Sequence, residues 1–320
     1  MLKEKLRDFS LSESDFQSKP TSRRTLAEAL TGKLPLSLLE VLPESLDVIG
    51  DIAVVELPDE FKPHERTLAE GILAVNRNVR VVLAKTGAVS GKERIRPVRF
   101  LAGEERTTSI HREFGCRIKV DLAKAYFSPR LSHEHQRVAE MVKNGERVID
   151  MFAGVGPFSI MIAKKLSEVG VDAIDANPEA VKLLKENIGL NKLRGTVRVW
   201  QGDAEDVVRT HLVHVATRVI MNHPSGSNGF IPAGCEALMP EGGVVHYYTF
   251  AGGSDWELRA TDEFVQGLAK CNWNLVKLLG TRKVRGVAPM RWQVAVDAKV
   301  EPEVMPLPRL RPLPQGPAAG

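Results

Sequence analysis

The chain has 320 residues, enough to bury a substantial core in about two domains. Its composition, 43% hydrophobic and 26% charged, is typical of a soluble globular protein. No apolar run reaches the ~20 residues needed to cross a bilayer, and the first residues lack the apolar core of a secretory signal. Three isolated cysteines predict neither a disulfide framework nor a zinc knuckle. We therefore expect a cytoplasmic protein without a membrane association.

The net charge of +4 is distributed unevenly along the chain. Between Arg80 and Arg130 there are 12 Lys or Arg against 5 Asp or Glu, a local excess of +7, so the remainder is slightly acidic. Such a basic segment favours a surface that faces a polyanion. A solvated face with scattered arginines fits the charge alone equally well.

The first half of the chain predicts a small α/β module. Gly50-Asp51 is a two-residue turn signal between two runs of β-branched residues. The expected elements in chain order are a loose polar arm at 1–22, a short helix at 24–30, two strands within 46–57, a helix at 65–76, a strand at 79–85, a basic glycine-bearing loop at 86–100 and paired strands within 107–122.

From Glu134 onward, helices alternate with apolar strands. Strands are expected at 147–153, 171–175, 197–202, 218–223 and 244–250, helices at 158–166, 179–188, 204–212 and 232–239, and two more strand-like runs at 275–280 and 292–300. This alternation predicts a Rossmann-like, doubly wound and mostly parallel sheet. Six prolines after residue 300 predict an extended tail.

The segment DMFAGVGPFSI (150–160) lies at a strand–turn–helix junction, where open α/β sheets bind their ligands. Gly154 and Gly156 allow a tight turn and a close approach of the backbone to a ligand. Ser159 occupies the third position of the dinucleotide fingerprint, so that fingerprint is not met. The pattern does not favour a pyrophosphate-bearing cofactor.

Three acids accompany these glycines. Asp150 precedes them, Asp175 ends the second strand 19 residues after Gly156, and Asp203 follows the third strand. Asp175 is placed to accept the ribose hydroxyls, and Asp203 to meet an adenine amino group. A nucleoside cofactor without pyrophosphate, S-adenosyl-L-methionine (AdoMet), fits this set better than NAD. Asp150 and Asp203 taken singly could instead cap the following helices.

Asn222-His223-Pro224 ends the fourth strand. An Asn/Asp-x-Pro at this place is common in methyltransferases that act on planar nitrogens, because the amide and the rigid backbone hold the edge of the base. The alternative is a simple turn signal.

The motifs together resemble those of the archaeal and eukaryotic tRNA (guanine-37-N1) methyltransferases. The resemblance extends from about Asp47 to Val300 and rests on HREFGCRIKVDLAKAYFSPRLSHEH, DMFAGVGPFSI, DANPEAVKLLKENIGLNKL, RVIMNHP and GGVVHYYTF. It implies a class I AdoMet methyltransferase that acts, as a monomer, on the anticodon stem-loop of tRNA. One departure is His223, where the family usually has leucine.

Methylation of N1 of guanine requires removal of its proton, and a cation near O6 stabilises the resulting enolate, with no metal needed. The resemblance implies that Glu134 of SPRLxxE is the general base, that Arg94 holds O6, and that Asn222 and Pro224 position the base. The AdoMet pocket it implies is lined by Tyr126, Arg130, Asp150, Phe152, Gly154, Gly156, Asp175, Asp203 and Asn222. From the residues alone, Glu134 also suits a helix-dipole partner, and Arg94 a phosphate contact.

The expected domains are a short N-terminal segment at 1–45, a small α/β basic RNA-facing domain at 46–130, a Rossmann-like methyltransferase domain at 131–300 and a Pro-rich tail at 301–320. Three alternatives remain: a wybutosine-pathway transferase (aminocarboxypropyl transfer, or methylation of a tricyclic precursor), a non-catalytic tRNA-binding protein, and an amino-group methyltransferase for adenine or glutamine. The last would favour an aromatic residue after the proline, where Ser225 stands.

Overall fold

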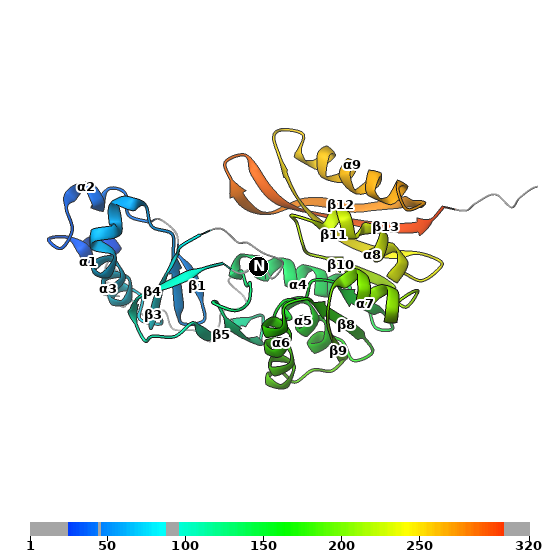
Figure 1. The fold of residues 1–320 in the computed structure, drawn as a ribbon, viewed down its shortest axis with the longest axis horizontal. Helices are drawn as coiled ribbons and strands as arrows, with labels where there is room; N and C mark the ends of the chain where they lie inside the picture. Colours follow the sequence, from blue (N-terminus) through cyan, green and yellow to red (C-terminus); the bar gives the residue numbers. More distant parts are fainter. Residues whose placement is uncertain (1–24, 44–45, 88–95, 304–320) are drawn as a thin grey trace, which may run out of the picture.

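The computed structural model describes residues 25–43, 46–87 and 96–303 (Figure 1). The expected polar arm, most of the expected basic loop with Arg94, and the Pro-rich tail after residue 303 lie outside the described residues.

A four-stranded sheet, ordered β1-β2-β3-β4, forms the N-terminal part, and short helices cover one of its faces. Its elements are α1 (Leu26–Leu30), α2 (Leu36–Leu39), β1 (Asp47–Ile49), β2 (Ile52–Val55), η2 (Asp59–His64), α3 (Glu65–Val75), β3 (Val81–Lys85) and β4 (Val98–Gly103). The strand β4 begins at Val98, so it corrects only the end of the loop expected over 86–100. Basic residues hide its pattern in the sequence, but its backbone pairs antiparallel with β3.

A hairpin of β5 (Thr108–Glu113) and β6 (Cys116–Asp121) follows, as expected. Two side-chain amides bind the β6 edge of this hairpin, Asn187 of α6 (Pro178–Leu190) and Asn191, which directly follows that helix. Asn187 accepts from the backbone N–H of Lys119 at 2.7 Å, and Asn191 accepts from that of Arg117 at 2.9 Å. These bonds satisfy backbone groups that a free edge strand would leave open. Leu30, Leu34 and Leu38 of the expected N-terminal segment share a hydrophobic cluster with Ala53 and Val55 of β2, and the expected boundaries at 45 and 130 stay a prediction.

The C-terminal part is a seven-stranded sheet ordered β12-β13-β11-β10-β7-β8-β9. Strands β7 to β11 pair in parallel, while β13 and β12 pair antiparallel, which confirms the doubly wound, mostly parallel architecture. The strands are β7 (Arg147–Asp150), β8 (Gly170–Asp175), β9 (Thr196–Gln201), β10 (Arg218–Met221), β11 (Gly243–Gly252), β12 (Trp273–Ala288) and β13 (Arg291–Pro302).

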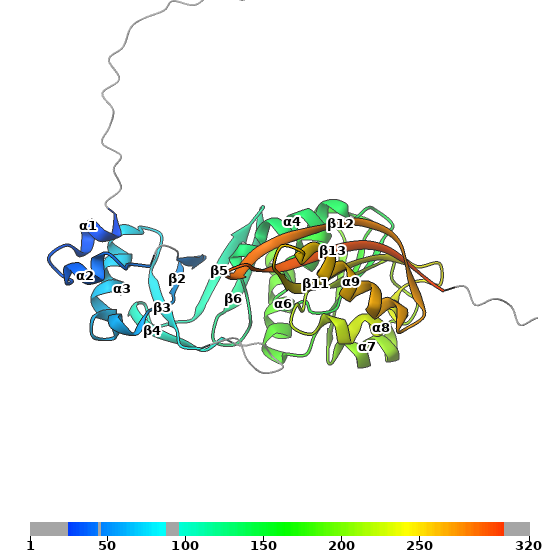
Figure 2. The same cartoon turned by 90° about the horizontal axis from the view of Figure 1, so that it is seen from above.

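Helices cover both faces of this sheet (Figures 1 and 2). Helices α4 to α6 pack on one face, and α7 to α9 on the other. With α6 already given, their bounds are α4 (Ser132–Met141), α5 (Pro157–Lys165), α7 (Ala204–His211), α8 (Ile231–Ala237) and α9 (Trp256–Ala269).

The hairpin β12–β13 is longer than the sequence predicts. Arg282, Lys283 and Arg285 interrupt the apolar pattern, but the backbone continues to pair, with several register shifts. Its turn lies on the side of the body that faces the N-terminal sheet (Figures 1 and 2). The extra length places Arg285 and Gln293 beyond the end of β10, where they contact residues of the expected site.

Candidate active site

The ends of four neighbouring parallel strands carry four of the expected site residues. Asp150 ends β7, Asp175 ends β8, Asp203 lies just after β9 and Asn222 just after β10. Because the carboxyl ends of parallel strands lie along one edge of a sheet, the fold brings these side chains to the same edge. This edge is where an open α/β sheet binds its ligand.

The glycine turn after β7 is fixed by Asp175. Gly154 and Gly156 both take positive φ, +56° and +91°, which favours glycine. The carboxylate of Asp175 accepts the backbone N–H of Gly154 at 2.7 Å and that of Asn177 at 2.9 Å. Since a carboxylate oxygen can accept more than one hydrogen bond, this oriented acid suits the two ribose hydroxyls of AdoMet.

Asp150 is fully buried behind the turn and accepts a hydrogen bond from Ser159 Oγ at 2.7 Å. Burial, together with the nearby charge of Asp175, raises the pKa of Asp150 to about 7. Asp150 does not cap the following helix, because Gly156 occupies the N-cap position of α5. Asp203 does cap α7 and accepts from Glu205 N at 3.0 Å, while its side chain stays exposed.

Replacing Asp150 with Asn should stabilise the protein increasingly as the pH rises. The folded-state pKa of about 7 lies above the usual 3.8, so the wild-type protein loses stability as the pH rises from about 4 through 7, while an amide loses none. The melting temperature of the variant minus that of the wild type should increase by about 5–10 °C from pH 4 to pH 8. Thermal melts at several pH values measure this, with the exposed Asp262→Asn as control. A difference that does not change with pH would contradict it.

Glu134 lies in the first turn of α4 and is only 6% exposed. Its Oε1 accepts from Tyr248 Oη at 2.7 Å and from Arg137 Nη2 at 2.6 Å, while Oε2 accepts from Arg137 Nε at 2.8 Å. A helix-dipole partner would need none of these bonds. The three donors hold the carboxylate in one orientation.

Arg137 also joins Glu134 to a buried acid. Its Nη1 donates to Asp297 at 2.7 Å, and His246 Nδ1 lies 2.6 Å from the same carboxylate. Burial by itself raises the pKa of Asp297, but His246 and Arg137 outweigh it and lower that pKa to about 2. Arg218 donates to His246 Nε2 at 2.8 Å, so His246 carries its proton on Nδ1. The sequence did not reveal this chain of charges.

Two further residues missed in the sequence link the expected motifs. Arg285 donates to Tyr126 Oη at 2.8 Å and to Gln293 Oε1 at 2.8 Å, and Gln293 Nε2 donates to Asn222 Oδ1 at 2.9 Å. Gln293 is 1% exposed. Its only signal in the sequence is a polar residue within the apolar run of β13.

Three rings lie together beside Asn222. Phe152 lies 4.9 Å from both His223 and Phe230, measured between ring centroids. His223, the departure from the family pattern, thus packs among rings, and Pro224 beside it is buried. The packing favours a structural replacement of leucine by this histidine.

Arg130 was expected at the cofactor, but its Nε donates to Asp47 of β1 at 2.7 Å. Lys85 of β3 also binds Asp47, at 3.0 Å. These contacts tie the SPRL segment to the N-terminal sheet, and the expected contact of Arg130 with AdoMet stays a prediction.

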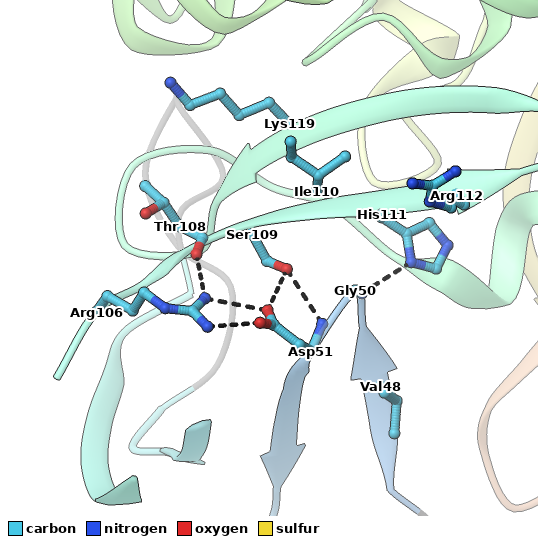
Figure 3. Close-up of a pocket in the computed structure, with 10 residues that line it drawn as sticks. All are labelled: Val48, Gly50, Asp51, Arg106, Thr108, Ser109, Ile110, His111, Arg112 and Lys119. Atoms are coloured by element: carbon cyan, nitrogen blue, oxygen red, sulfur yellow. Dashed lines mark hydrogen bonds and ion pairs between the residues drawn. The ribbon is translucent and has the colours of Figure 1, made fainter. Parts of the chain in front are cut away.

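A cavity of about 660 Å³ lies between the β1–β2 turn and β5 (Figure 3). Arg106 pairs with Asp51 at 2.6 Å, and Ser109 Oγ donates to Asp51 at 2.7 Å. The N–H of Gly50 donates to His111 at 3.1 Å, and a Cβ added at Gly50 would lie 2.1 Å from Ser109 Oγ. These contacts join the N-terminal sheet closely to the hairpin.

In the part of the chain that the structure describes, no group of three or more His, Cys, Asp or Glu is arranged to hold a metal ion. Within the same residues, no helix combines the length and apolar character needed to span a membrane.

Comparison with known proteins places this geometry in a family. A model described as the TRM5/TYW2 methyltransferase domain matches residues 109–272, and one described as the TYW2 N-terminal domain matches 26–107.

Both branches of that family are among the relatives. The tRNA (guanine(37)-N(1))-methyltransferase Trm5b of Pyrococcus abyssi is 39% identical over 92% of this chain and 86% of its own length. The tRNA(Phe) (4-demethylwyosine(37)-C(7)) aminocarboxypropyltransferase of Pyrococcus horikoshii is 30% identical over 86% of this chain and 96% of its own. A solved complex of aTrm5 with tRNALeu superposes with a TM-score of 0.74 at 35% identity, covering 91% of this chain and 83% of that one.

Proposed function

Because the chain belongs to the AdoMet-dependent TRM5/TYW2 methyltransferase family, we propose that it methylates N1 of guanine 37 in tRNA. The observation that carries the proposal is the buried, oriented carboxylate of Glu134, in the fold whose strand ends hold Asp175 and Asn222. Such a carboxylate meets the need of a nitrogen that must lose its proton before it can react.

In this proposal the proton of N1 moves to Glu134. Its Oε2 accepts a single hydrogen bond from the described residues, whereas Oε1 accepts two, so Oε2 is the oxygen available to the proton. When bound, AdoMet supplies an electrophilic methyl group. Asp175 and the glycine turn hold its ribose, and Asn222 with Pro224 holds the base edge.

Negative charge then develops on O6 of the base. Arg94 is expected to stabilise it, and Arg285 offers a second cation, since its described contacts are a tyrosine, a serine and a glutamine, all uncharged. A fixed cation in a water-poor site stabilises developing charge without reorganisation.

The test is to incubate the purified protein with methyl-labelled AdoMet and an unmodified tRNA bearing guanine 37, followed by nucleoside mass spectrometry. We expect labelled 1-methylguanosine, and none when adenine replaces that guanine. A parallel reaction on a tRNA carrying the wybutosine precursor, with AdoMet labelled in its carboxyl group, detects aminocarboxypropyl transfer.

Aminocarboxypropyl transfer is the second candidate, because residues 26–107 match the TYW2 N-terminal domain. Methyl transfer is preferred for two reasons. The SPRL, GVGPF and N-x-P motifs are all present, and the Trm5b relative matches more of the chain at higher identity than the aminocarboxypropyltransferase does.

The hairpin β5–β6 offers a surface for the RNA backbone. Arg112 and Arg117 lie directly opposite each other in the register, and both are exposed. Like charges at such positions destabilise a sheet, and among the described residues neither arginine forms an ion pair with an acid. Exposed Ile110 and Phe114 lie on the same hairpin. A polyanion would remove the repulsion between the two arginines.

Replacing Arg112 and Arg117 together with Gln should weaken tRNA binding and its dependence on salt. Each lost phosphate contact lowers the slope of log K against log salt by about 0.7–0.9, so two lost contacts should lower it by about 1.4–1.8. Filter binding or fluorescence anisotropy at several salt concentrations measures the slope. The control is Arg259→Gln, which changes an exposed arginine of α9 that pairs with Asp255. An unchanged slope in the double variant would exclude this surface.

A further inference from the structure

Asn222 is bound on one side by a chain of hydrogen bonds whose direction is fixed. The chain runs from Arg285 through Gln293 to Asn222, with distances of 2.8 Å and 2.9 Å. All three side chains are partly or fully buried, and Gln293 lies at 1% exposure between β12 and β11.

The direction follows from chemistry. An arginine guanidinium can only donate, so the atom of Gln293 that faces Arg285 Nε must be its carbonyl oxygen. The amide nitrogen of Gln293 is then the group left to meet Asn222, and it can only donate. Asn222 must therefore turn its Oδ1 toward Gln293. Networks of this kind decide the orientation of amides whose two ends look alike.

Asn222 Nδ2 is consequently the amide group left for a ligand, and no described residue accepts a hydrogen bond from it. We propose that Arg285 and Gln293 act as positioning residues that make Asn222 a hydrogen-bond donor toward the substrate base, so that the site selects a base with an acceptor at that edge. The inference rests on the proposed function, which places the target base beside Asn222.

A hydrogen-bond donor fixed at Asn222 would distinguish guanine from adenine by the group at position 6. Guanine presents the acceptor O6 where adenine presents the N6 amino donor. A donor fixed at Asn222 bonds O6 of guanine and meets another donor in adenine. Its bond also strengthens as negative charge develops on O6, because charge-assisted hydrogen bonds are stronger than neutral ones.

The test compares two substrates in variants that alter the chain. Gln293→Glu offers only acceptors, so Asn222 must turn its Nδ2 toward residue 293 and present Oδ1 to the base. Gln293→Met removes the link without reversing it. Exposed Lys299→Gln on the same strand is the control. The substrates are tRNAs with guanine or 6-thioguanine at position 37, since sulfur is a weak acceptor.

For each enzyme, kcat and KM are measured on both tRNAs and the ratio of kcat/KM for guanine to that for 6-thioguanine is taken. The two bases differ in intrinsic reactivity, but this difference is the same for every enzyme. It therefore cancels when the ratio of a variant is compared with that of the wild type. We expect it to fall about 10-fold in Gln293→Glu and about 3-fold in Gln293→Met, the range for one hydrogen bond, and not in Lys299→Gln. AdoMet affinity should stay near that of the wild type, which shows that the variants fold.

Equal losses on both tRNAs in every variant would overturn the inference, because a merely structural role lowers both rates alike. If Gln293→Glu fails to bind AdoMet, Gln293→Leu replaces it: like Gln293→Met it removes the donor that faces Asn222 Oδ1, and the ratio should fall by a similar factor. A wild-type protein that makes no 1-methylguanosine refutes the proposed function itself, whereas normal activity with unchanged ratios refutes only the role of Gln293.

Discussion

Replacing Glu134 with Gln should lower methyl transfer by about 10²–10⁴-fold, the range for losing a general base. The amide keeps the size of the side chain and can still accept from Tyr248 and Arg137 through its oxygen, but it cannot take the proton of N1. Single-turnover rates on tRNA with guanine 37 measure the loss. AdoMet binding, measured by calorimetry, should stay nearly unchanged.

Asp175→Ala is the matched counterpart in the same site. It removes the carboxylate that orients the Gly154 turn, so it should weaken AdoMet binding. At saturating AdoMet its loss of rate should be smaller than that of Glu134→Gln. Turnover near the wild-type rate in Glu134→Gln would remove Glu134 from the mechanism.

Replacing Arg137 with Met should destabilise the protein by about 3–5 kcal/mol, because it leaves the buried carboxylates of Glu134 and Asp297 without their shared cation. Asp297 has no exposed surface, so water cannot replace the lost charge. The free energy of unfolding in urea measures the effect. Arg259→Met, which breaks an exposed ion pair on α9, should cost at most about 1 kcal/mol.

A second substitution separates charge from packing. Asp297→Asn in the Arg137→Met background removes one of the two buried acids that have lost this cation, so the double variant should regain part of the lost stability. The two sites contact each other directly, and their effects should therefore not add. Strict additivity would show that the loss comes from packing of the arginine side chain and not from the buried negative charge left without the arginine.

The sequence by itself determined the features that depend on neighbouring residues. Apolar strands alternating with helices gave the Rossmann-like part, and Gly154, Gly156 and Asp175 were found because a strand, a turn and a helix N-terminus adjoin along the chain. Glu134 and Asn222 were proposed as site residues from motifs of only a few residues, and their roles stay predictions. Periodicity and turn chemistry are local, so they can be read without knowing the tertiary structure.

The same local signals failed where charge interrupts an apolar pattern. The strand β4 lies among basic residues, and the second half of β12 carries charged side chains, yet both form because a partner strand supplies their backbone hydrogen bonds. Asp203 could not be separated from a helix cap, and the structure shows that it is one.

Only the tertiary structure decided the partners of the site residues. Arg137 meets Asp297 across 160 positions, Arg285 meets Tyr126 across 159, and Gln293 meets Asn222 across 71. Which side chains meet at such separations depends on the order of strands in the sheet and on the length of the β12–β13 hairpin. The physical reason is that hydrogen bonds and ion pairs are short-ranged, so a residue's partners are set by what the fold places within about 3 Å of it.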